Sequence, residues 1–341
     1  MLKQLETERL LIRTSVASDA AELAIRRSNP TLAEFQNWSI PYTLQQAIEL
    51  LANNPSWTDK TDGQYHLIVC DKSNGASVGD FAVGLSNDGR TAEIGYSLNE
   101  DAWGNEYAAE AAAAVVAYLF TSVGVSRIKG SIHPDNVASA RVLEQAGLTF
   151  EGDHALAYWV DDNNTDDRIY GMTRAGWEAW RTRPSDHPSQ VDFAEISAQT
   201  VDSVLALRTH ETQTKFVSPM SVSFGHAMFS GLEKDGFVAT TWMRAIHADD
   251  QLVGFVMMAQ PNQSGRSAYL WRLLIDRMHQ RRGIGQLALA LVIEQARLWG
   301  ASDLTVHWCE GPGSPAPLYL NNGFVPTGKI IDGETEAQLA L

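Results

Sequence analysis

The sequence predicts an α/β protein in which one domain of mixed sheet and helices occurs twice in tandem. Three observations support this prediction. The chain has 341 residues, which exceeds the ~100–200 residues of a typical single domain. Three short landmarks recur in the same order in the two halves. Each half also shows several strands, then a long helix and further strands, an order typical of mixed α/β sheets.

The recurring landmarks are a Val-Gly pair after a polar turn, the opening of a long helix, and a glycine followed by a large apolar residue. Their paired positions are Val78-Gly79 with Val253-Gly254, Glu106-Tyr107-Ala108 with Gly283-Ile284-Gly285, and Gly147-Leu148 with Gly323-Phe324. Because the offset is nearly constant, we interpret them as an internal repeat. We expect domains at residues 1–182 and 191–341, joined by a linker at 183–190, which contains two prolines and no large apolar residue.

The second half shows the predicted elements most clearly. Residues 238–247 and 252–260 alternate in polarity around a short polar turn, which indicates a β-hairpin. Residues 267–275 are nearly continuously apolar and predict a third strand. Residues 283–299 carry apolar side chains at helical spacing. A strand at 304–308 then leads to a Gly/Pro-rich loop, a short helix and two final strands.

The first half shows the same order. Strands are predicted at 65–71, 77–84, 91–98 and 127–132, helices at 105–121 and 136–146, and two last strands around Tyr158 and Tyr170. Strands before the long helix and strands after it predict a mixed sheet in each half.

The composition excludes several classes of function. The chain carries 41 acids against 26 Lys and Arg, a net charge of −15, which argues against nucleic-acid binding. Two cysteines, Cys70 and Cys309, are too few for a disulfide framework, and their spacing suggests no metal site. The charged N-terminus predicts no signal peptide, and no apolar run is long enough to span a membrane. We therefore expect a cytoplasmic protein that uses no metal and binds no membrane.

The strongest chemical signal is the segment QRRGIG at 280–285, which lies between an apolar strand and a long amphipathic helix. Glycines there let several backbone N–H groups converge on one anion, and the helix N-terminus adds the positive end of its dipole. Five arginines fall between Arg266 and Arg282, with Asp276 as the only acid among them. The segment therefore predicts a pyrophosphate-binding loop made of Gln280, Arg281, Arg282, Gly283, Ile284 and Gly285.

The segment is neither a dinucleotide fingerprint, because it lacks the third glycine, nor a Walker loop, because it lacks the Gly-Lys-Ser/Thr end. Its pattern resembles the acetyl-CoA loop of the GNAT superfamily of N-acetyltransferases. Residues 191–341 resemble the diamine and spermidine acetyltransferases, and residues 5–177 resemble the ribosomal-protein N-terminal acetyltransferases. The supporting stretches are 215–221, 271–276, 322–328 and 332–334 in the second half, and 5–13, 93–96 and 136–144 in the first. The resemblance implies acetyl-CoA as cosubstrate.

Acetyl transfer needs a neutral amine, donors for the oxyanion and a proton for the departing thiolate. The resemblance implies that backbone N–H groups of Leu274 or Ile275 serve the oxyanion. It also implies that Tyr319, four residues before Gly323, protonates the thiolate.

The base that takes the proton of the amine has two candidates. Glu310 follows the strand that should diverge beside the thioester, and Glu334 lies in the last hairpin. Both carboxylates also suit binding of a cationic amine. His307 lies on the same strand as Glu310 and is expected to be a core residue.

The first copy departs from the loop pattern. Trp103 stands where the pattern has Gln or Arg, and Glu106 stands at the first glycine position. A carboxylate repels a pyrophosphate, so this copy is expected to bind CoA poorly. In the alternative interpretation, Gly104 supplies the turn and Glu106 faces solvent. Leu143 occupies the position of the tyrosine and has no proton to give, and Glu93 would be the base to test if this copy is active.

The sequence thus predicts an N-acetyltransferase, an acyltransferase that moves an acetyl group directly from acetyl-CoA to a primary amine in the C-terminal domain. Three alternatives stay open. The N-terminal domain could be the catalyst, acting on a peptide N-terminus or a small amine. It could instead be a non-catalytic partner in an internal pseudo-dimer, or the protein could be a CoA-binding sensor without turnover. The acceptor is open among polyamines, antibiotic amines, amino acids and peptide termini, and nothing predicts the oligomeric state.

Overall fold

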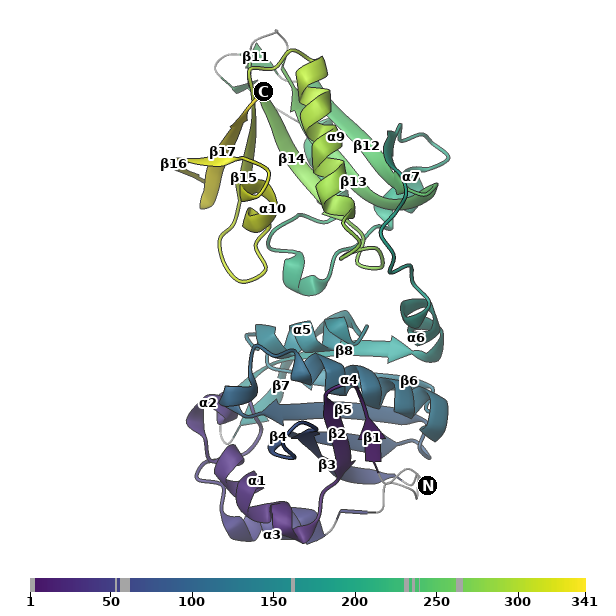
Figure 1. The fold of residues 1–341 in the computed structure, drawn as a ribbon, viewed down its shortest axis with the longest axis vertical. Coiled ribbons are helices and arrows are strands. Elements are labelled where there is room, and N and C mark those ends of the chain that lie inside the picture. The colour runs from purple at the N-terminus through teal and green to yellow at the C-terminus, as the bar shows by residue number, and fades with distance from the viewer. Residues whose placement is uncertain are drawn as a thin grey trace. The chain divides into compact units, whose positions relative to one another are not determined.

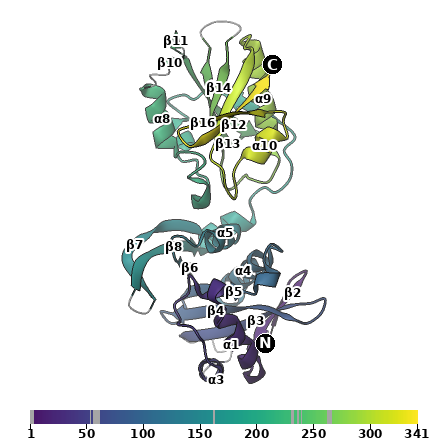
Figure 2. The same ribbon diagram turned by 90° about the vertical axis from the view of Figure 1, so that its left-hand side faces the viewer.

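The computed structural model describes residues 4–52, 54–55, 62–160, 163–229, 233–234, 237–238, 240–261 and 266–341. The chain divides into two compact units, Met1–Arg181 and Thr182–Leu341, and each unit is described by itself (Figures 1 and 2). Each unit is built around one mixed β-sheet, so the predicted fold class is confirmed.

The first unit contains an eight-stranded sheet in the order β1-β2-β3-β4-β5-β6-β8-β7. The strands are β1 (Gln4–Glu6), β2 (Leu10–Thr14), β3 (Gly63–Asp71), β4 (Ser77–Ser86), β5 (Thr91–Leu98), β6 (Arg127–Ile132), β7 (Thr149–Val160) and β8 (Asn163–Thr173). The β5/β6 pair is parallel, and the other neighbouring pairs are antiparallel.

The helices of the first unit are α1 (Ala20–Arg27), α2 (Pro30–Ala33), α3 (Leu44–Ala52), α4 (Tyr107–Tyr118), α5 (Val137–Gln145) and α6 (Arg174–Arg181). Helix α4 packs on the sheet through small and β-branched side chains, which allow a close approach: Ala111, Ala112, Val115 and Val116. The helix predicted at 105–121 is observed over the shorter range Tyr107–Tyr118, because residues Leu119–Val123 form a π-helical turn that ends at Gly124. Helices α1 and α3 form a smaller cluster with each other.

The second unit contains a seven-stranded sheet in the order β16-β17-β15-β14-β13-β12-β9. Its strands are β9 (Val191–Ala194), β12 (Thr240–Ala248), β13 (Gln251–Gln260), β14 (Ala268–Ile275), β15 (Asp303–Trp308), β16 (Val325–Ile331) and β17 (Glu334–Ala340), and β10 (Glu233–Lys234) pairs separately with β11 (Phe237–Val238). The β14/β15 pair is parallel. Read in reverse, this is the strand order of the first sheet without β1.

Helices cover both faces of the second sheet. Helix α9 (Ile284–Leu298) lies along one face (Figure 1), with a buried stripe at helical spacing: Ile284, Ala288, Leu289, Val292 and Ala296. Helices α7 (Val201–Leu205) and α8 (Met220–Met228) pack on the other face around Val204, Met220 and Phe255. Short helix α10 (Ala316–Leu320) precedes the final hairpin. The sequence analysis did not predict α7 and α8.

The repeated Val-Gly landmark has a steric cause. A Cβ added at Gly254 would lie 2.3 Å from the backbone oxygen of Leu274, and one added at Gly79 would lie 2.5 Å from the oxygen of Ser97. Each glycine therefore sits on a strand whose neighbour passes too close for any side chain. The two copies share this constraint because they share the same strand pairing.

Strands β13 and β14 contain a bulge that the corresponding strands β4 and β5 of the first sheet lack. The β13–β14 register shifts between the pairs Met257–Arg272 and Met258–Leu270, which leaves Trp271 unopposed. Strands β4 and β5 instead pair residue for residue along their length. Such a bulge bends a strand and redirects its side chains.

Candidate acetyl-transfer site

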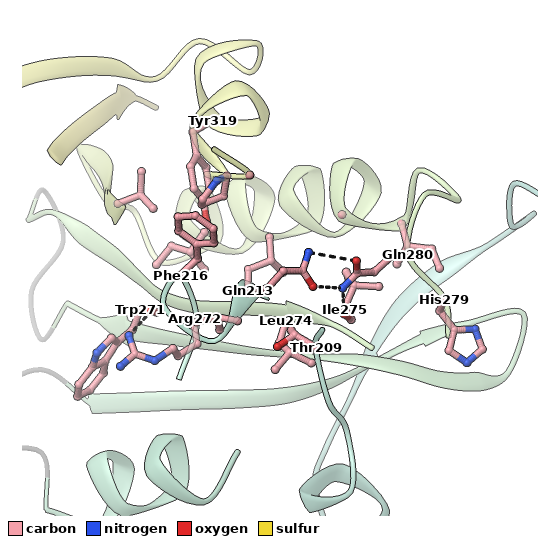
Figure 3. A pocket seen from close by; sticks show the side chains of 18 of the residues that line it. Thr209, Gln213, Phe216, Trp271, Arg272, Leu274, Ile275, His279, Gln280 and Tyr319 are labelled. Carbon is pink, nitrogen blue, oxygen red and sulfur yellow. Dashed lines mark hydrogen bonds between the residues drawn. The ribbon is translucent and has the colours of Figure 1, made fainter. Parts of the chain in front are cut away.

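A cavity of about 260 Å³ opens in the second unit where two parallel strands separate. Strand β14 pairs with β15 only through Ala268, Tyr269 and Leu270, and the rest of β14 lines the cavity. The loop 280–285, the start of α9 and Tyr319 complete the wall, as Figure 3 shows for the labelled residues. The topology thus brings together segments that are far apart in the sequence.

The loop 280–285 has a concave backbone. Arg281 has a φ of 62° and Gly283 a φ of 77°, and Gly283 is the N-cap of α9. Alternation between ordinary and left-handed conformations turns neighbouring N–H groups toward one point, and the first turn of a helix leaves N–H groups without intrahelical partners. This concave shape suits an anion. Contacts between the loop and a pyrophosphate remain a prediction.

Arg282 points away from the cavity. Its side chain is buried, its Nε donates to the backbone oxygen of Asp186 at 2.8 Å, and its Nη1 lies 3.1 Å from Nδ1 of His279. The ring of His187 also covers Gly283, since a Cβ there would lie 2.8 Å from two ring atoms. The segment predicted as a linker therefore packs on the loop, and a cofactor contact of Arg282 depends on its backbone alone.

Gln280 is held in place by a pair of reciprocal amide hydrogen bonds. Its Nε2 donates to Oε1 of Gln213 at 2.9 Å and to the backbone oxygen of Ile275 at 3.0 Å, while Nε2 of Gln213 donates back at 3.2 Å. Figure 3 shows this pair in the centre of the cavity wall. Gln280 thus joins the loop to the end of β14 and to the segment before α8.

Three guanidinium groups gather beside the loop. Burial, together with the charges of Arg277, Arg281 and Arg183, lowers the pKa of His210 to about 4. Burial and then the charges of Arg277 and Arg281 also lower the pKa of Arg183. Like charges this close repel one another, and a bound polyanion would relieve that repulsion. Sequence analysis did not identify Arg183, because it lies in the predicted linker.

Leu274 and Ile275 lie on the cavity wall, at the end of β14 that β15 no longer accompanies. Leu274 packs its side chain toward α7 and α8, and Ile275 packs toward α9. These two residues end β14, so their backbone is the part of the strand closest in sequence to the loop 280–285. The predicted role of their N–H groups is compatible with this position and stays a prediction.

Tyr319 lies on the cavity wall in α10. Its ring stacks on Trp308 with centroids 5.7 Å apart and meets Phe324 edge-on at 5.6 Å, so its orientation is fixed. Burial raises the pKa of the phenol above its ordinary value, which keeps the proton on at neutral pH. Among the residues that the structure describes, the hydroxyl makes no hydrogen bond and is available to a ligand.

The two carboxylates predicted as bases are not among the residues that line the cavity. Glu310 lies beyond the end of β15, is exposed, and accepts hydrogen bonds from Trp308 Nε1 at 2.7 Å and Thr335 Oγ1 at 2.8 Å. Glu334 begins β17 and lies 3.7 Å from the sulfur of Cys309. The carboxylate of Glu310 thus links the end of β15 to β17 through its hydrogen bonds with Trp308 and Thr335.

His307, expected to be a core residue, instead lines the cavity. Its Nδ1 lies 3.3 Å from the hydroxyl of Tyr269, and its Nε2 lies 3.4 Å from Oε2 of Glu336. Burial raises the pKa of Glu336, but hydrogen bonds from Thr327, Lys329 and His307 outweigh it, so the net pKa is lowered. No sequence signal pointed to this position, because the cross-strand pairing of His307 with Glu336 appears only in the β15–β17 register.

The loop of the first unit has nearly the same backbone as the second. Gly104 has a φ of 76° and Glu106 a φ of 60°, and these residues correspond to Arg281 and Gly283. Glu106 is exposed and is the N-cap of α4. The loop thus has the geometry of the alternative interpretation, in which Gly104 supplies the turn and Glu106 faces solvent, and poor CoA binding by this copy stays a prediction.

Other candidate residues of the first unit have structural partners. Leu143, which corresponds to Tyr319 in the second unit, is buried in the main core, and its side chain fills the space that a Cβ at Gly130 would need. Glu93 forms an ion pair with Lys129 at 2.8 Å across the parallel pair β5/β6. The carboxylate to be tested as a base in the first copy is thus already engaged in an ion pair.

Within the described part of the chain, no group of three or more His, Cys, Asp or Glu side chains is arranged to hold a metal ion. The helices described there include none that is both long and apolar enough to cross a membrane.

The two units each match a known family. Residues 9–149 match the acetyltransferase (GNAT) domain, and residues 209–324 match the acetyltransferase (GNAT) family. Together these matches cover more than half of the chain. The protein belongs to the GNAT family of acetyltransferases, enzymes that use acetyl-CoA, and it carries two GNAT domains in tandem.

Two similar proteins each match about half of the chain. YoaA of Bacillus subtilis, described as an uncharacterized N-acetyltransferase, is 29% identical over 178 residues, which are 51% of this chain and 98% of YoaA. The protein p20 of Bacillus licheniformis, also described as an uncharacterized N-acetyltransferase, is 29% identical over 153 residues, which are 44% of this chain and 85% of p20.

Two solved structures are similar in fold. A GNAT-family acetyltransferase from Bacillus anthracis has a TM-score of 0.45 and 23% identity, and covers 50% of this chain and 99% of its own. RimL, a ribosomal L7/L12 alpha-N-protein acetyltransferase in complex with CoA, has a TM-score of 0.46 and 16% identity, with 50% and 97% covered.

Proposed function

We propose that the second domain transfers the acetyl group of acetyl-CoA to a primary amine. One observation carries this proposal: a single cavity is lined by the loop 280–285, the separated end of β14, His307 and Tyr319. Acetyl-CoA supplies a thioester whose acyl carbon a neutral amine attacks. The reaction forms an N–C bond, breaks the C–S bond, and turns an ammonium ion into an amide with release of a thiol and one proton.

The loop and its arginines would hold the phosphates. The left-handed backbone at Arg281 and Gly283 and the N-terminus of α9 present N–H groups to an anion, while Arg183 and Arg277 add charge beside them. Beyond Leu270, β14 has no partner in β15, so its free backbone groups are available to the amides of the cofactor arm.

Tyr319 and His307 would move the protons. The neutral phenol of Tyr319 donates to the departing sulfur, and its packing against Trp308 fixes the direction. His307 accepts the proton of the ammonium ion at Nδ1, where the substrate amine would replace the hydrogen bond of the Tyr269 hydroxyl, and Glu336 on the Nε2 side stabilises the charged imidazole that results. Glu334 and Glu310 lie outside the cavity wall, and in this proposal neither is the base.

Calorimetric titration with acetyl-CoA tests the location of the site. Gly283→Glu places a carboxylate in the second loop, and Glu106→Gly removes one from the first. One binding site per chain that disappears in Gly283→Glu supports the proposal. A site that survives Gly283→Glu contradicts it.

A second candidate is catalysis by the N-terminal domain. The specific observation in its favour is that the loop around Gly104 and Glu106 keeps the left-handed backbone of the second loop. If this domain binds acetyl-CoA, the titration gives a site that Gly283→Glu leaves intact and that Glu106→Gly tightens. Acetyl transfer to a peptide N-terminus by Gly283→Glu protein would then favour this domain as the catalyst.

A further inference from the structure

The cavity has a second charged end, at the bulge of β14. Figure 3 shows Trp271 and Arg272 at one end of the strand, with Gln280 and His279 toward the other. Trp271 and Arg272 both line the cavity. Since the phosphate-binding loop is at the far end, Arg272 is placed to meet the acceptor and not the phosphates.

The guanidinium of Arg272 is only partly satisfied by the protein. Its Nη1 donates to the backbone oxygen of Trp271 at 2.9 Å, and its Nη2 donates to Oγ of Ser218 at 3.3 Å. Its Nε is buried and has no hydrogen-bond partner. Both acceptors are uncharged, and among the described residues Arg272 forms no ion pair.

Arg272 is half-buried, and a guanidinium nitrogen that is buried without an acceptor is costly. Other arginines of the chain pair with carboxylates. Buried Arg26 forms an ion pair with Asp80 at 3.1 Å, and half-buried Arg13 pairs with Asp19 at 2.7 Å. Burial lowers the pKa of Arg272, although the charges of Tyr269 and Glu334 oppose that shift. Glu334 is thus near Arg272 without reaching it.

We propose that the acceptor of the second domain is an amino acid, whose carboxylate binds the Arg272 guanidinium. This inference rests on the proposed acetyl transfer in the same cavity. A carboxylate supplies the charged acceptor that the guanidinium lacks, and the planar fork of arginine suits it. The amine of the same small molecule then lies within the cavity that His307 also lines. A diamine or polyamine would instead bring a second cation toward Arg272.

The first test compares matched acceptors on the full chain. Thiol release from acetyl-CoA is measured with the twenty L-amino acids, with their carboxamides, and with putrescine and spermidine. We expect at least one amino acid to be acetylated, with kcat/KM about ten-fold or more above that of its carboxamide. Turnover of diamines or carboxamides without turnover of amino acids overturns this inference and leaves the proposed function standing. No turnover with any amine overturns both.

The second test changes the guanidinium. Arg272→Met should lower kcat/KM for the amino acid by about 100-fold and bring the acid-to-amide ratio close to one. Arg272→Lys keeps the charge but loses the fork, and should recover part of the ratio. Arg297→Met, at an exposed arginine paired with Glu294, is the matched control and should keep the ratio. An equal loss for acid and amide in Arg272→Met would mean a structural role and would overturn the inference.

Discussion

We expect the backbone shape at Gly283 to control the affinity of the second domain for CoA. Its φ of 77° lies in the left-handed region, and the ring of His187 covers it. Gly283→Ala therefore adds two separate costs. The left-handed conformation costs a residue with a Cβ roughly 1–2 kcal/mol, and the 2.8 Å approach to His187 adds roughly 1 kcal/mol of overpacking.

The free loop of this variant relieves these costs by moving, and anion binding must then restore the strained shape. The affinity for CoA should therefore fall by about 2–3 kcal/mol, which corresponds to roughly 30- to 150-fold. In the double variant His187→Ala/Gly283→Ala the steric part disappears while the backbone part stays. The loss should shrink to roughly 5- to 30-fold.

Calorimetric titration with CoA measures both losses directly. Gly225→Ala is the matched control, because Gly225 lies in α8 and a Cβ there meets nothing within 4 Å; its CoA affinity should equal that of the wild type. Unchanged affinity in Gly283→Ala would refute the link between loop shape and binding. A double variant no better than the single one would refute the role assigned to His187.

Three further predictions follow from the packing of the second unit. Tyr319→Phe should lower kcat about 10- to 100-fold at constant KM for acetyl-CoA, and an unchanged kcat in the variant would contradict the role of Tyr319 as proton donor. Because the pKa of Tyr319 is raised, the wild-type rate should show no alkaline decline from this group up to pH 10. Gly254→Ala should destabilise the second unit by about 2–3 kcal/mol in denaturant unfolding, since its Cβ meets the oxygen of Leu274 at 2.3 Å, whereas a wild-type midpoint would mean that the strands can separate. The pKa of His210 is lowered to about 4 from an unfolded value near 6.5. Between these two pH values the unfolded state binds more protons, so the stability of the second unit should fall as the pH drops from about 6.5 to 4. Thermal melting of His210→Gln should lack this decline, and an equal decline in the variant would mean that other groups cause it.

The sequence anticipated the order of elements in both domains because hydrophobic periodicity reports local burial. The segment 283–299 is predicted as a helix and is observed as Ile284–Leu298, and the hairpin around residues 249–250 is observed between β12 and β13. The short helices α7 and α8 were missed. They are held by contacts with residues of distant strands, such as Phe255, and local pattern does not report such contacts.

The candidate site could be predicted only in part. The loop 280–285 carries its own signal, because glycine and arginine at a helix start are visible in a single segment. Arg282 was assigned from the loop pattern and Glu310 from its place after β15. Their side chains instead bind Asp186, His279, Trp308 and Thr335 within the protein. Which way a charged side chain points depends on neighbours that are remote in sequence.

The sequence by itself determined that the chain is a tandem repeat and that a loop with two glycines opens its long helix, because repeats, periodicity and turn residues are properties of contiguous segments. Anion binding by that loop stays a prediction. Only the tertiary structure decided which groups share the cavity. The parting of β14 from β15 after Leu270, the bulge at Trp271 and the pairing of His307 with Glu336 all arise from strand register. Register is set by pairing across the sheet, and pairing brings together residues that the sequence keeps apart.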